Sequence, residues 1–222
     1  MKVLVRSMAM AMAVAALAAP SNAGPGVIPG GSATNEFIGD LSLGPTIGGY
    51  YGANLYLVGG PVDIQVDWYG GEAGYQNEFW WDGVQRFVHP GGDTTGSAVD
   101  GTFTVTNVST GLLPFHFFVP TGSLTVANGS NPDNSGLGPN FFSTFYPLSS
   151  GIAHETPGGP EGGQFVWLFF DDGGAADDDN HDDMAIRLSI TNGDGHFATP
   201  EPGTMLLVGS GIAALWTRRR RS

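Results

Sequence analysis

The residues best suited to chemistry form one acidic run, which reads Asp-Asp-Gly-Gly-Ala-Ala-Asp-Asp-Asp-Asn-His-Asp-Asp over residues 171–183. Its seven carboxylates are crowded between two apolar segments, 165–170 and 184–190. Two carboxylates about 4 Å apart repel each other by roughly 1 kcal/mol in water, and by more where solvent is excluded. A hard cation that takes about six to eight oxygen ligands removes that cost. The run therefore predicts a calcium site, with five candidate ligands: Asp171, Asp172, Asp177, Asp179 and Asp183.

A second interpretation of the run is a solvated acidic hairpin loop, because runs of like charge are usually solvated. The spacing does not match an EF-hand loop with its terminal Glu, so it fixes no coordination geometry. His181 lies inside the run, where it could ligate the ion or orient a carboxylate. His116 lies inside an apolar run and is expected to be a hydrogen-bonded strand residue.

The acidic run also resembles a known segment. A strand ending in Phe-Asp-Asp-Gly, followed by Asp-Asp-Asn-His-Asp-Asp and a short alternating strand, is similar to part of the DUF4114-like bacterial domains. The resemblance covers this segment alone and implies calcium binding by its carboxylates. His181 departs from the pattern of those domains, in which the corresponding portion reads Asp-x-Asp-x-Asn-Asp.

Trp80 and Trp81 are the aromatic residues best placed to bind a sugar. Neighbouring residues of a strand point to opposite faces, so one of the two rings is expected to be less buried. An exposed tryptophan beside Asn77 and Asp82 could stack on a sugar ring, which makes a carbohydrate-binding module one alternative function. The other interpretation is that both rings pack in a sandwich core or at its edge.

The sequence does not favour an enzyme. It contains no Gly-x-Ser-x-Gly nucleophile motif, and its glycine runs lack the Lys and Ser or Thr of a phosphate-binding loop. It contains no cysteine, which excludes thiol catalysis, cysteine metal sites and disulfides. Glu72 or Glu78 near Asp82 could supply the carboxylate pair of a polysaccharide hydrolase, but no pair stands out from the acidic background.

The segments that must position these residues are predicted to be short strands. The chain has 36 Gly and 15 Pro, the poorest residues for the interior of a helix. Period-2 alternation predicts half-buried strands, and continuous apolar runs predict central strands. The alternating segments are 62–69, 102–107 and 184–191, the continuous ones are 115–119 and 165–170, and shorter strands are expected at 55–58 and 123–127.

Many short strands joined by glycine-rich turns indicate an all-β fold, an antiparallel β-sandwich, with a jelly roll as one topology. We expect this domain at residues 37–192, after a flexible lead-in at 24–36 and before a linker at 193–199. The asparagine-rich segment 128–140 is expected to be a long loop.

The N-terminus is typical of a secretory signal peptide over residues 1–23. Lys2 and Arg6 precede an apolar run, 8–19, and Pro20 ends that run. Small residues then lead to a cleavage site for signal peptidase after Ala23.

The C-terminus has an uncharged apolar segment, 203–217, followed by Arg218, Arg219, Arg220 and Arg221. As a short helix it would reach about 22 Å, less than a hydrocarbon core of about 30 Å, so we expect a marginal membrane span. The arginines should stay cytoplasmic and leave the body outside. With Pro200, Glu201 and Pro202 before it, residues 200–222 resemble the PEP-CTERM sorting signal of Gram-negative bacteria. That resemblance implies processing by an exosortase and delivery to the cell surface or the extracellular polysaccharide.

The charge of the body limits its partners. Between Glu36 and Asp194 there are 20 of the 21 acidic residues and only two basic ones, Arg86 and Arg187, a formal charge of −18. Such a body repels nucleic acid and anionic lipid head groups. The sequence as a whole predicts an exported structural protein of the surface or matrix with a calcium-binding loop, and a carbohydrate-binding module or a polysaccharide hydrolase as alternatives.

Overall fold

The computed structural model describes residues 23–148, 162–176 and 178–199. Most of the predicted signal peptide, the sorting segment 200–222 with its predicted hydrophobic helix, and Asp177 lie outside these ranges. One short helix is present, α2 (Glu36–Asp40), with a 3₁₀ turn at Gly174–Ala176. The strands are β1 (Gly24–Ile28), β2 (Ile47–Tyr51), β3 (Tyr56–Val58), β4 (Val62–Trp68), β5 (Glu72–Ala73), β6 (Asn77–Trp81), β7 (Val84–His89), β8 (Gly92–Asp93), β9 (Gly101–Val108), β10 (Gly111–Leu112), β11 (Phe115–Val119), β12 (Leu124–Ala127), β13 (Asn140–Thr144), β14 (Gly162–Gly163), β15 (Phe165–Asp171), β16 (Met184–Asn192) and β17 (His196–Ala198).

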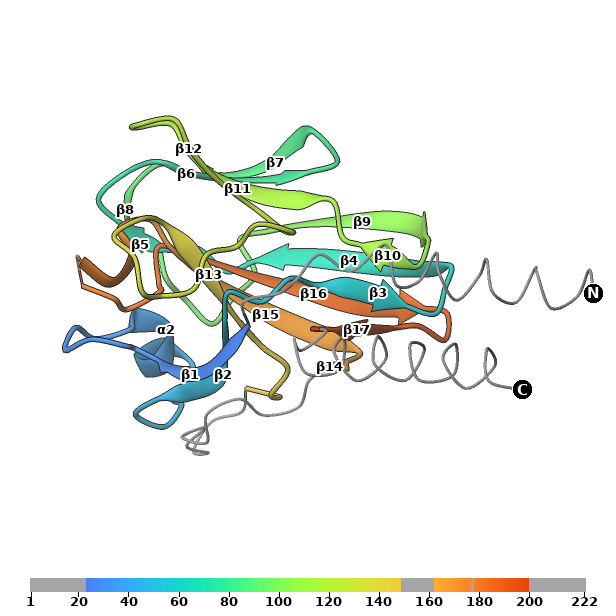
Figure 1. The fold of residues 1–222 in the computed structure, drawn as a ribbon, viewed down its shortest axis with the longest axis horizontal. Helices are drawn as coiled ribbons and strands as arrows, with labels where there is room; N and C mark the ends of the chain where they lie inside the picture. The colour runs from blue at the N-terminus through green and yellow to red at the C-terminus, as the bar shows by residue number, and fades with distance from the viewer. Residues whose placement is uncertain (1–22, 149–161, 177, 200–222) are drawn as a thin grey trace, which may run out of the picture.

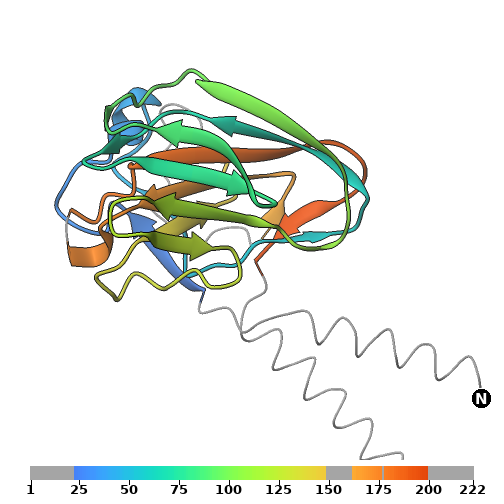
Figure 2. The same cartoon turned by 90° about the horizontal axis from the view of Figure 1, so that it is seen from above.

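The strands form an antiparallel sandwich, which confirms the predicted fold class (Figure 1). The main sheet has seven strands in the order β1-β2-β13-β15-β16-β4-β9. Two four-stranded sheets, β12-β11-β6-β7 and β10-β3-β17-β14, contribute residues to the same apolar core as the main sheet. Seen from above, the β12-β11-β6-β7 sheet lies in front of the main sheet (Figure 2).

Strand β15 lies at the centre of the main sheet and is buried on both faces. Val166, Leu168 and Phe170 belong to the core between the sheets, and Phe170 stacks on Phe117 of β11 with ring centroids 4.5 Å apart. The alternate residues of β15, such as Phe169, belong to a second apolar cluster on the other face, which includes Phe37 of α2. This double burial explains the continuous apolar run from which the central strand was predicted.

The alternating segments behave as their pattern predicts. Along β4, Val62, Ile64 and Val66 are buried and Asp63 and Gln65 are half-buried, until the buried Asp67 ends the alternation. Strand β9 is an edge strand of the main sheet and is more exposed. Its pattern shifts at Asn107, which has φ +60° and lies at a β-bulge opposite Asp63. The bulge explains why Val108, and not Asn107, continues the inward-facing row.

Two segments that the sequence predicted to be unstructured pair as strands, which corrects both predictions. Residues 24–28, expected in the flexible lead-in, form β1 and pair with all five residues of β2. Ile28 is fully buried in the second apolar cluster, so burial and a complete ladder override the local Gly and Pro content. Residues 196–198, expected in the linker, form β17 between β3 and β14, with Phe197 fully buried.

The predicted loop at 128–140 connects β12 to β13, and its asparagines are largely buried. The Asn128 side chain receives a hydrogen bond from the Leu55 amide and donates to the carbonyls of Leu55 and Leu113. The Asn131 side chain likewise accepts a hydrogen bond from the Phe141 amide and donates one to the Phe141 carbonyl. These side chains form hydrogen bonds with backbone amides and carbonyls that are not paired in a β-ladder. They thereby hold the loop against the end of the sandwich.

Candidate metal centre

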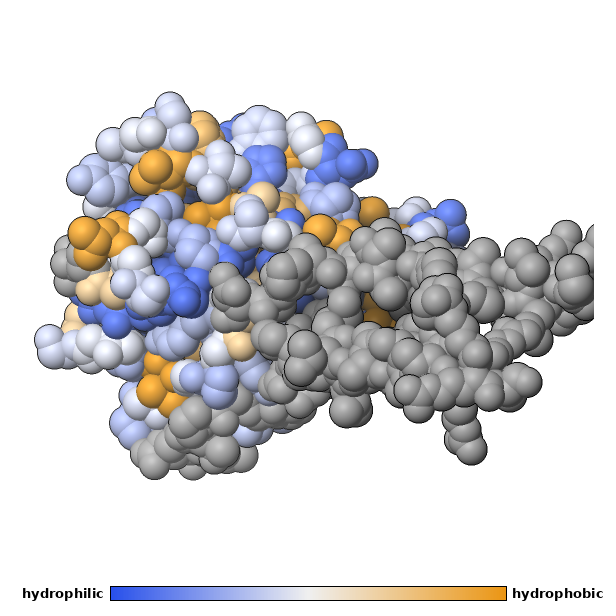
Figure 3. Space-filling view, viewed as in Figure 1, coloured by the Kyte–Doolittle hydropathy of each residue, from blue (hydrophilic) through white to orange (hydrophobic). Residues whose placement is uncertain are grey.

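The acidic loop 171–183 connects β15 to β16 and folds into the protein. Asp171, His181 and Asp182 are 1%, 0% and 0% exposed. These three residues are therefore not part of a solvated hairpin, whereas Asp178 of the same run is exposed. The loop lies at one end of the sandwich, where the surface is largely hydrophilic (Figures 1 and 3).

The segment between β1 and α2 holds the loop in place. The amide of Gly30 donates to the carbonyl of Asp179, and a Cβ at Gly30 would clash with the carboxylate of Asp179. A side chain at position 30 would therefore displace that carboxylate from its present place. Asn35, the N-cap of α2, donates from its side chain to the carbonyl of Asn180, and the amide of Glu36 donates to the carboxylate of Asp182. The predicted lead-in is thus part of the site.

Three potential ligand atoms converge inside the loop. Asp171, Asp179 and His181 each offer one atom, and these atoms lie within 4.8 Å of one another. His181 Nδ1 is 3.5 Å from Asp171 Oδ2 and 3.8 Å from Asp179 Oδ1. Among the described residues, neither His181 Nδ1 nor Asp171 Oδ2 has a hydrogen-bond partner. Buried polar atoms are nearly always paired, so these two atoms are candidates for binding an ion.

A chain of amide side chains leads from His181 back to Asp179. His181 Nε2 is 2.8 Å from Asn140 Oδ1, and Asn140 starts β13 directly opposite Asp171. Asn140 Nδ2 donates to Asn134 Oδ1 over 3.0 Å, and Asn134 Nδ2 donates to Asp179 Oδ1. The loop 128–140 therefore supplies the outer contacts of the group.

Burial dominates the ionisation of these residues. Desolvation raises the pKa of Asp171 to about 6, although hydrogen bonds from the Gly173 and Gly174 amides oppose the shift. Desolvation lowers the pKa of His181 to about 3, against a smaller opposing effect of the Asp179 backbone. The Asp179 carbonyl is already engaged by the Gly30 and Gly31 amides. His181 is therefore neutral at pH 7, the form that binds metals.

Two further carboxyl groups of the loop have raised pKa values. Burial raises the pKa of Asp182 to about 7 and that of Asp183 to about 10, with Asp172 as the next cause for Asp183. Asp183 accepts a hydrogen bond from the Asp172 amide over 2.6 Å. Asp182 Oδ1 has no partner among the described residues. These groups stabilise the backbone of the loop and do not join the converging ligand atoms.

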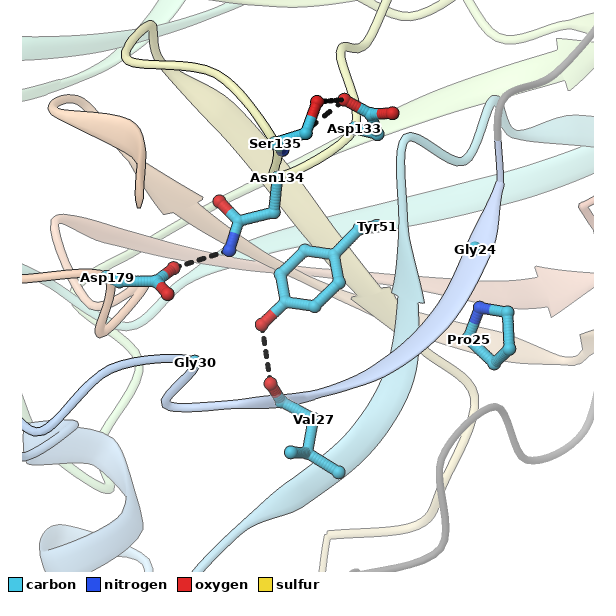
Figure 4. Close-up of a pocket in the computed structure, with 9 residues that line it drawn as sticks. All are labelled: Gly24, Pro25, Val27, Gly30, Tyr51, Asp133, Asn134, Ser135 and Asp179. Carbon is cyan, nitrogen blue, oxygen red and sulfur yellow. Dashed lines mark hydrogen bonds between the residues drawn. The ribbon is translucent and has the colours of Figure 1, made fainter. Parts of the chain in front are cut away.

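An open groove of about 480 Å³ lies beside Asp179, one of the three ligand residues (Figure 4). Asp179, Asn134 and Tyr51 line it, together with residues of β1. Tyr51 donates from its hydroxyl to the Val27 carbonyl, and its ring packs edge-on against His181 with centroids 5.3 Å apart. Figure 4 shows the Asn134 amide pointing at Asp179, with the Tyr51 ring beside them. The groove thus reaches the ligand group from the Asp179 side.

The structure brings together only some of the predicted ligands. Asp171 and Asp179 belong to the group, and His181 completes it. Asp172 instead accepts a hydrogen bond from Asn77, and Asp183 caps the Asp172 amide. Asn134, Asn140 and Tyr51 were not predicted, and the only sequence signal for the amides was the unusual asparagine content of the loop 128–140.

The two tryptophans point to opposite faces of β6, as predicted. Trp81 is 2% exposed and packs in the core against Phe115, so a sugar cannot reach it and its prediction as a stacking residue is wrong. Trp80 is half-buried on the outer face, where its ring stacks on His116 with centroids 5.6 Å apart. Trp80 Nε1 donates to the carboxylate of Glu78.

The residues considered for a hydrolase lie in different settings. Glu78 is largely buried and also accepts a hydrogen bond from Gln76. Glu72 lies on β5, and Asp82 lies in the turn between β6 and β7 with φ +49°. The carboxylates of this region serve local hydrogen bonds and turns in the described structure.

Comparison with known proteins identifies the tail. Residues 198–221 match the PEP-CTERM protein-sorting motif. Such a motif implies an exported protein that an exosortase processes. No curated protein matches the chain significantly.

One of the solved structures that match is the Chromobacterium violaceum lectin CV2L in complex with alpha-methyl-fucoside, at 14% identity. The match covers 61% of this chain and 94% of the lectin, with a TM-score of 0.35, which is too low to establish a shared fold. Within the described residues, no helix is long and apolar enough to cross a membrane. The segment 203–217, predicted as a membrane span, lies outside those residues.

Proposed function

We propose that this chain is an exported structural protein of the cell surface or the extracellular polysaccharide matrix, in which a divalent cation stabilises the acidic end of the sandwich. The sorting motif at residues 198–221 supports delivery to the envelope. In this proposal signal peptidase cuts after Ala23 and an exosortase processes the tail at the inner membrane of a Gram-negative bacterium. The protein acts without catalysis.

The observation that carries the cation is the convergence of His181 Nδ1 and two carboxylate oxygens, with two of the three atoms buried and unpartnered among the described residues. A cation there would neutralise Asp171 and Asp179 and would cross-link both ends of the acidic loop. Through the Asn134 and Gly30 contacts of Asp179 it would also fix the loop 128–140 and the segment after β1. Calcium is the ion predicted from the carboxylates of the run.

Melting of the full-length chain in mild detergent tests this function. Stripping with a chelator should lower the melting temperature, and Ca²⁺ or Zn²⁺ should restore it. At a ligand concentration about 100 times Kd the stabilisation is about 2.7 kcal/mol, which corresponds to roughly 5–10 °C for a domain of this size. Asp171→Asn should abolish the response, whereas Asp40→Asn, the same charge change at an exposed site, should retain it. A melting temperature that neither chelator nor cation changes would refute the proposal.

A carbohydrate-binding module is the second candidate, because Trp80 lies on the outer face of the β12-β11-β6-β7 sheet beside His116 and Glu78. Aromatic faces beside hydrogen-bonding groups are suited to sugar recognition. A glycan array tests this candidate. Binding that Trp80→Ala abolishes, while Val88→Ala on the neighbouring strand retains it, would support the module, and an array without signal would exclude it for the glycans tested.

A further inference from the structure

We infer that the cation is a first-row transition metal of the zinc type, bound by Asp171 Oδ2, Asp179 Oδ1 and His181 Nδ1, with a fourth coordination position that opens onto the groove. This inference rests on the proposed cation-binding function and names the chemical class of the ion. It differs from the calcium site predicted from the sequence in its ligands as well as in its metal.

The hydrogen-bond chain decides which ring nitrogen of His181 is free. A carboxylate can only accept, so the Asn134 group facing Asp179 must be its NH₂, and the Asn134 oxygen must face Asn140. The Asn140 NH₂ fills that position and leaves the Asn140 oxygen facing His181 Nε2. Nε2 therefore carries the proton. In the neutral ring, Nδ1 then presents a lone pair toward Asp171 and Asp179.

Three lone pairs that point at one another repel unless a proton or a metal ion lies between them. A proton on Nδ1 would make a charged imidazolium at a site that is fully buried, and a proton on Asp171 would pair only one of the two carboxylates with the ring. A metal ion uses the neutral ring and two carboxylates, so it neutralises the group without charging His181. The partner of Nε2 is an amide oxygen, the kind of outer contact that fixes the tautomer of metal-binding histidines.

The donor set favours a transition metal over calcium. Calcium takes oxygen ligands, whereas imidazole nitrogen is a preferred ligand of zinc and its neighbours in the first row. In a tetrahedral centre with bonds of about 2.0–2.1 Å, the ligand atoms lie roughly 3.3 Å apart. The observed separations from His181 Nδ1, 3.5 Å and 3.8 Å, need to shorten by only a few tenths of an ångström.

The position of the groove indicates where the fourth ligand enters. Asp171 and His181 are sealed from solvent, but the Asp179 side chain is 15% exposed and lines the groove with Asn134 and Tyr51. Closed structural zinc sites have four protein ligands, whereas three protein ligands leave a position for water or an oxygen of a second molecule. A small oxyanion or a hydroxyl group in the groove is the class of ligand that could take this position.

Metal titration of the stripped full-length chain tests the inference. Calorimetry at pH 7 should show one Zn²⁺ per chain, bound at least about tenfold more tightly than Ca²⁺. Co²⁺ in the same site should give the strong visible absorption of a four-coordinate centre. Asp179→Asn and His181→Gln should each weaken Zn²⁺ binding by about 100-fold or more and abolish the cobalt spectrum. Asp40→Asn and His116→Gln, which remove the same groups elsewhere, should leave both unchanged.

Each result separates the two proposals. Tighter binding of Ca²⁺ than of Zn²⁺ would overturn the transition-metal inference and leave the cation-binding function in place. Binding of neither ion would overturn both. If His181→Gln fails to fold, Asp179→Asn at the wall of the groove still decides the ligand set. Addition of acetate should shift the cobalt spectrum, and an unchanged spectrum would show that the fourth position is closed.

Discussion

His181 is a buried imidazole whose proton is placed by its neighbours and not by solvent. Its Nε2 faces an amide oxygen that a chain of two asparagines holds in orientation. In the proposed metal centre, the orientation of a single amide therefore determines whether Nδ1 has a free lone pair. Without the Asn140 oxygen, the proton of His181 would no longer be held on Nε2 and could move to Nδ1. Asn140 would thus affect the site although it is not one of the ligand residues.

The ionisation of the loop carboxyls predicts how stability depends on pH when no metal is bound. Burial raises the pKa of Asp171 to about 6 and of Asp182 to about 7 from an ordinary value of 3.8. Their contribution to stability is therefore complete at acid pH and is lost as the pH rises through those values. His181, lowered to about 3, acts in the opposite direction and loses its contribution as the pH falls from 6.5.

Asp183, raised to about 10, adds to the effect of the first two carboxyls, so the net slope from the loop groups is negative. His89 and His116, whose pKa values burial lowers from 6.5, oppose this slope elsewhere in the chain. The contribution of one loop carboxyl is therefore measured as the difference between the stripped chain and Asp182→Asn in urea denaturation with a chelator present. We expect the free energy of unfolding of the unsubstituted chain, relative to that of Asp182→Asn, to fall between about pH 4 and about pH 7. A difference that rises over this interval would contradict the assignment of a buried, protonated carboxyl.

The metal-ligating residues show how far sequence reasoning reaches at the residue scale. Asp171 and Asp179 were predictable, because a crowded acidic run between apolar strands needs neutralising charge. Asn134 and Asn140 were not, since they contact the run only after β13 has paired with β15. Nothing in local sequence encodes that register, so their roles were not predictable.

At the scale of the elements, periodicity predicted the strands whose two faces differ. Strands β4 and β16 alternate because one face packs in the core, and β15 is apolar throughout because both faces are buried. Strands β1 and β2 were missed. Their sequences, Gly-Pro-Gly-Val-Ile and Ile-Gly-Gly-Tyr-Tyr, have little local strand preference, and they are ordered by pairing and burial.

The pairing of β1 makes a prediction that distinguishes a strand from a flexible lead-in. Ile28 is fully buried against the second apolar cluster. Ile28→Ala should lower the free energy of unfolding by about 2–5 kcal/mol, because it leaves a cavity. Chemical denaturation measures the change, with Val99→Ala as the control, since Val99 is 46% exposed and should change stability by less than about 0.5 kcal/mol. A neutral Ile28→Ala would mean that β1 does not contribute to the folded state.

At the scale of the whole molecule, composition predicted the sandwich and its lack of long helices. It could not predict that the layer opposite the main sheet is divided into two sheets. Composition does not encode contacts between distant residues, such as the hydrogen bond from the Leu55 amide to the Asn128 side chain 73 positions away. The high acidic charge of the body is concentrated partly inside the molecule, at the end that carries the proposed metal centre.

Strand β17 places the sandwich directly against its own tail. Ala198, its last residue, is also the first residue of the sorting motif, and only Thr199 separates it from Pro200. The sorting motif thus begins inside a paired strand and not in a free linker. In the proposed function, an exosortase that contacts Ala198 would have to recognise it while it is paired in β17, or after β17 has separated from β3 and β14.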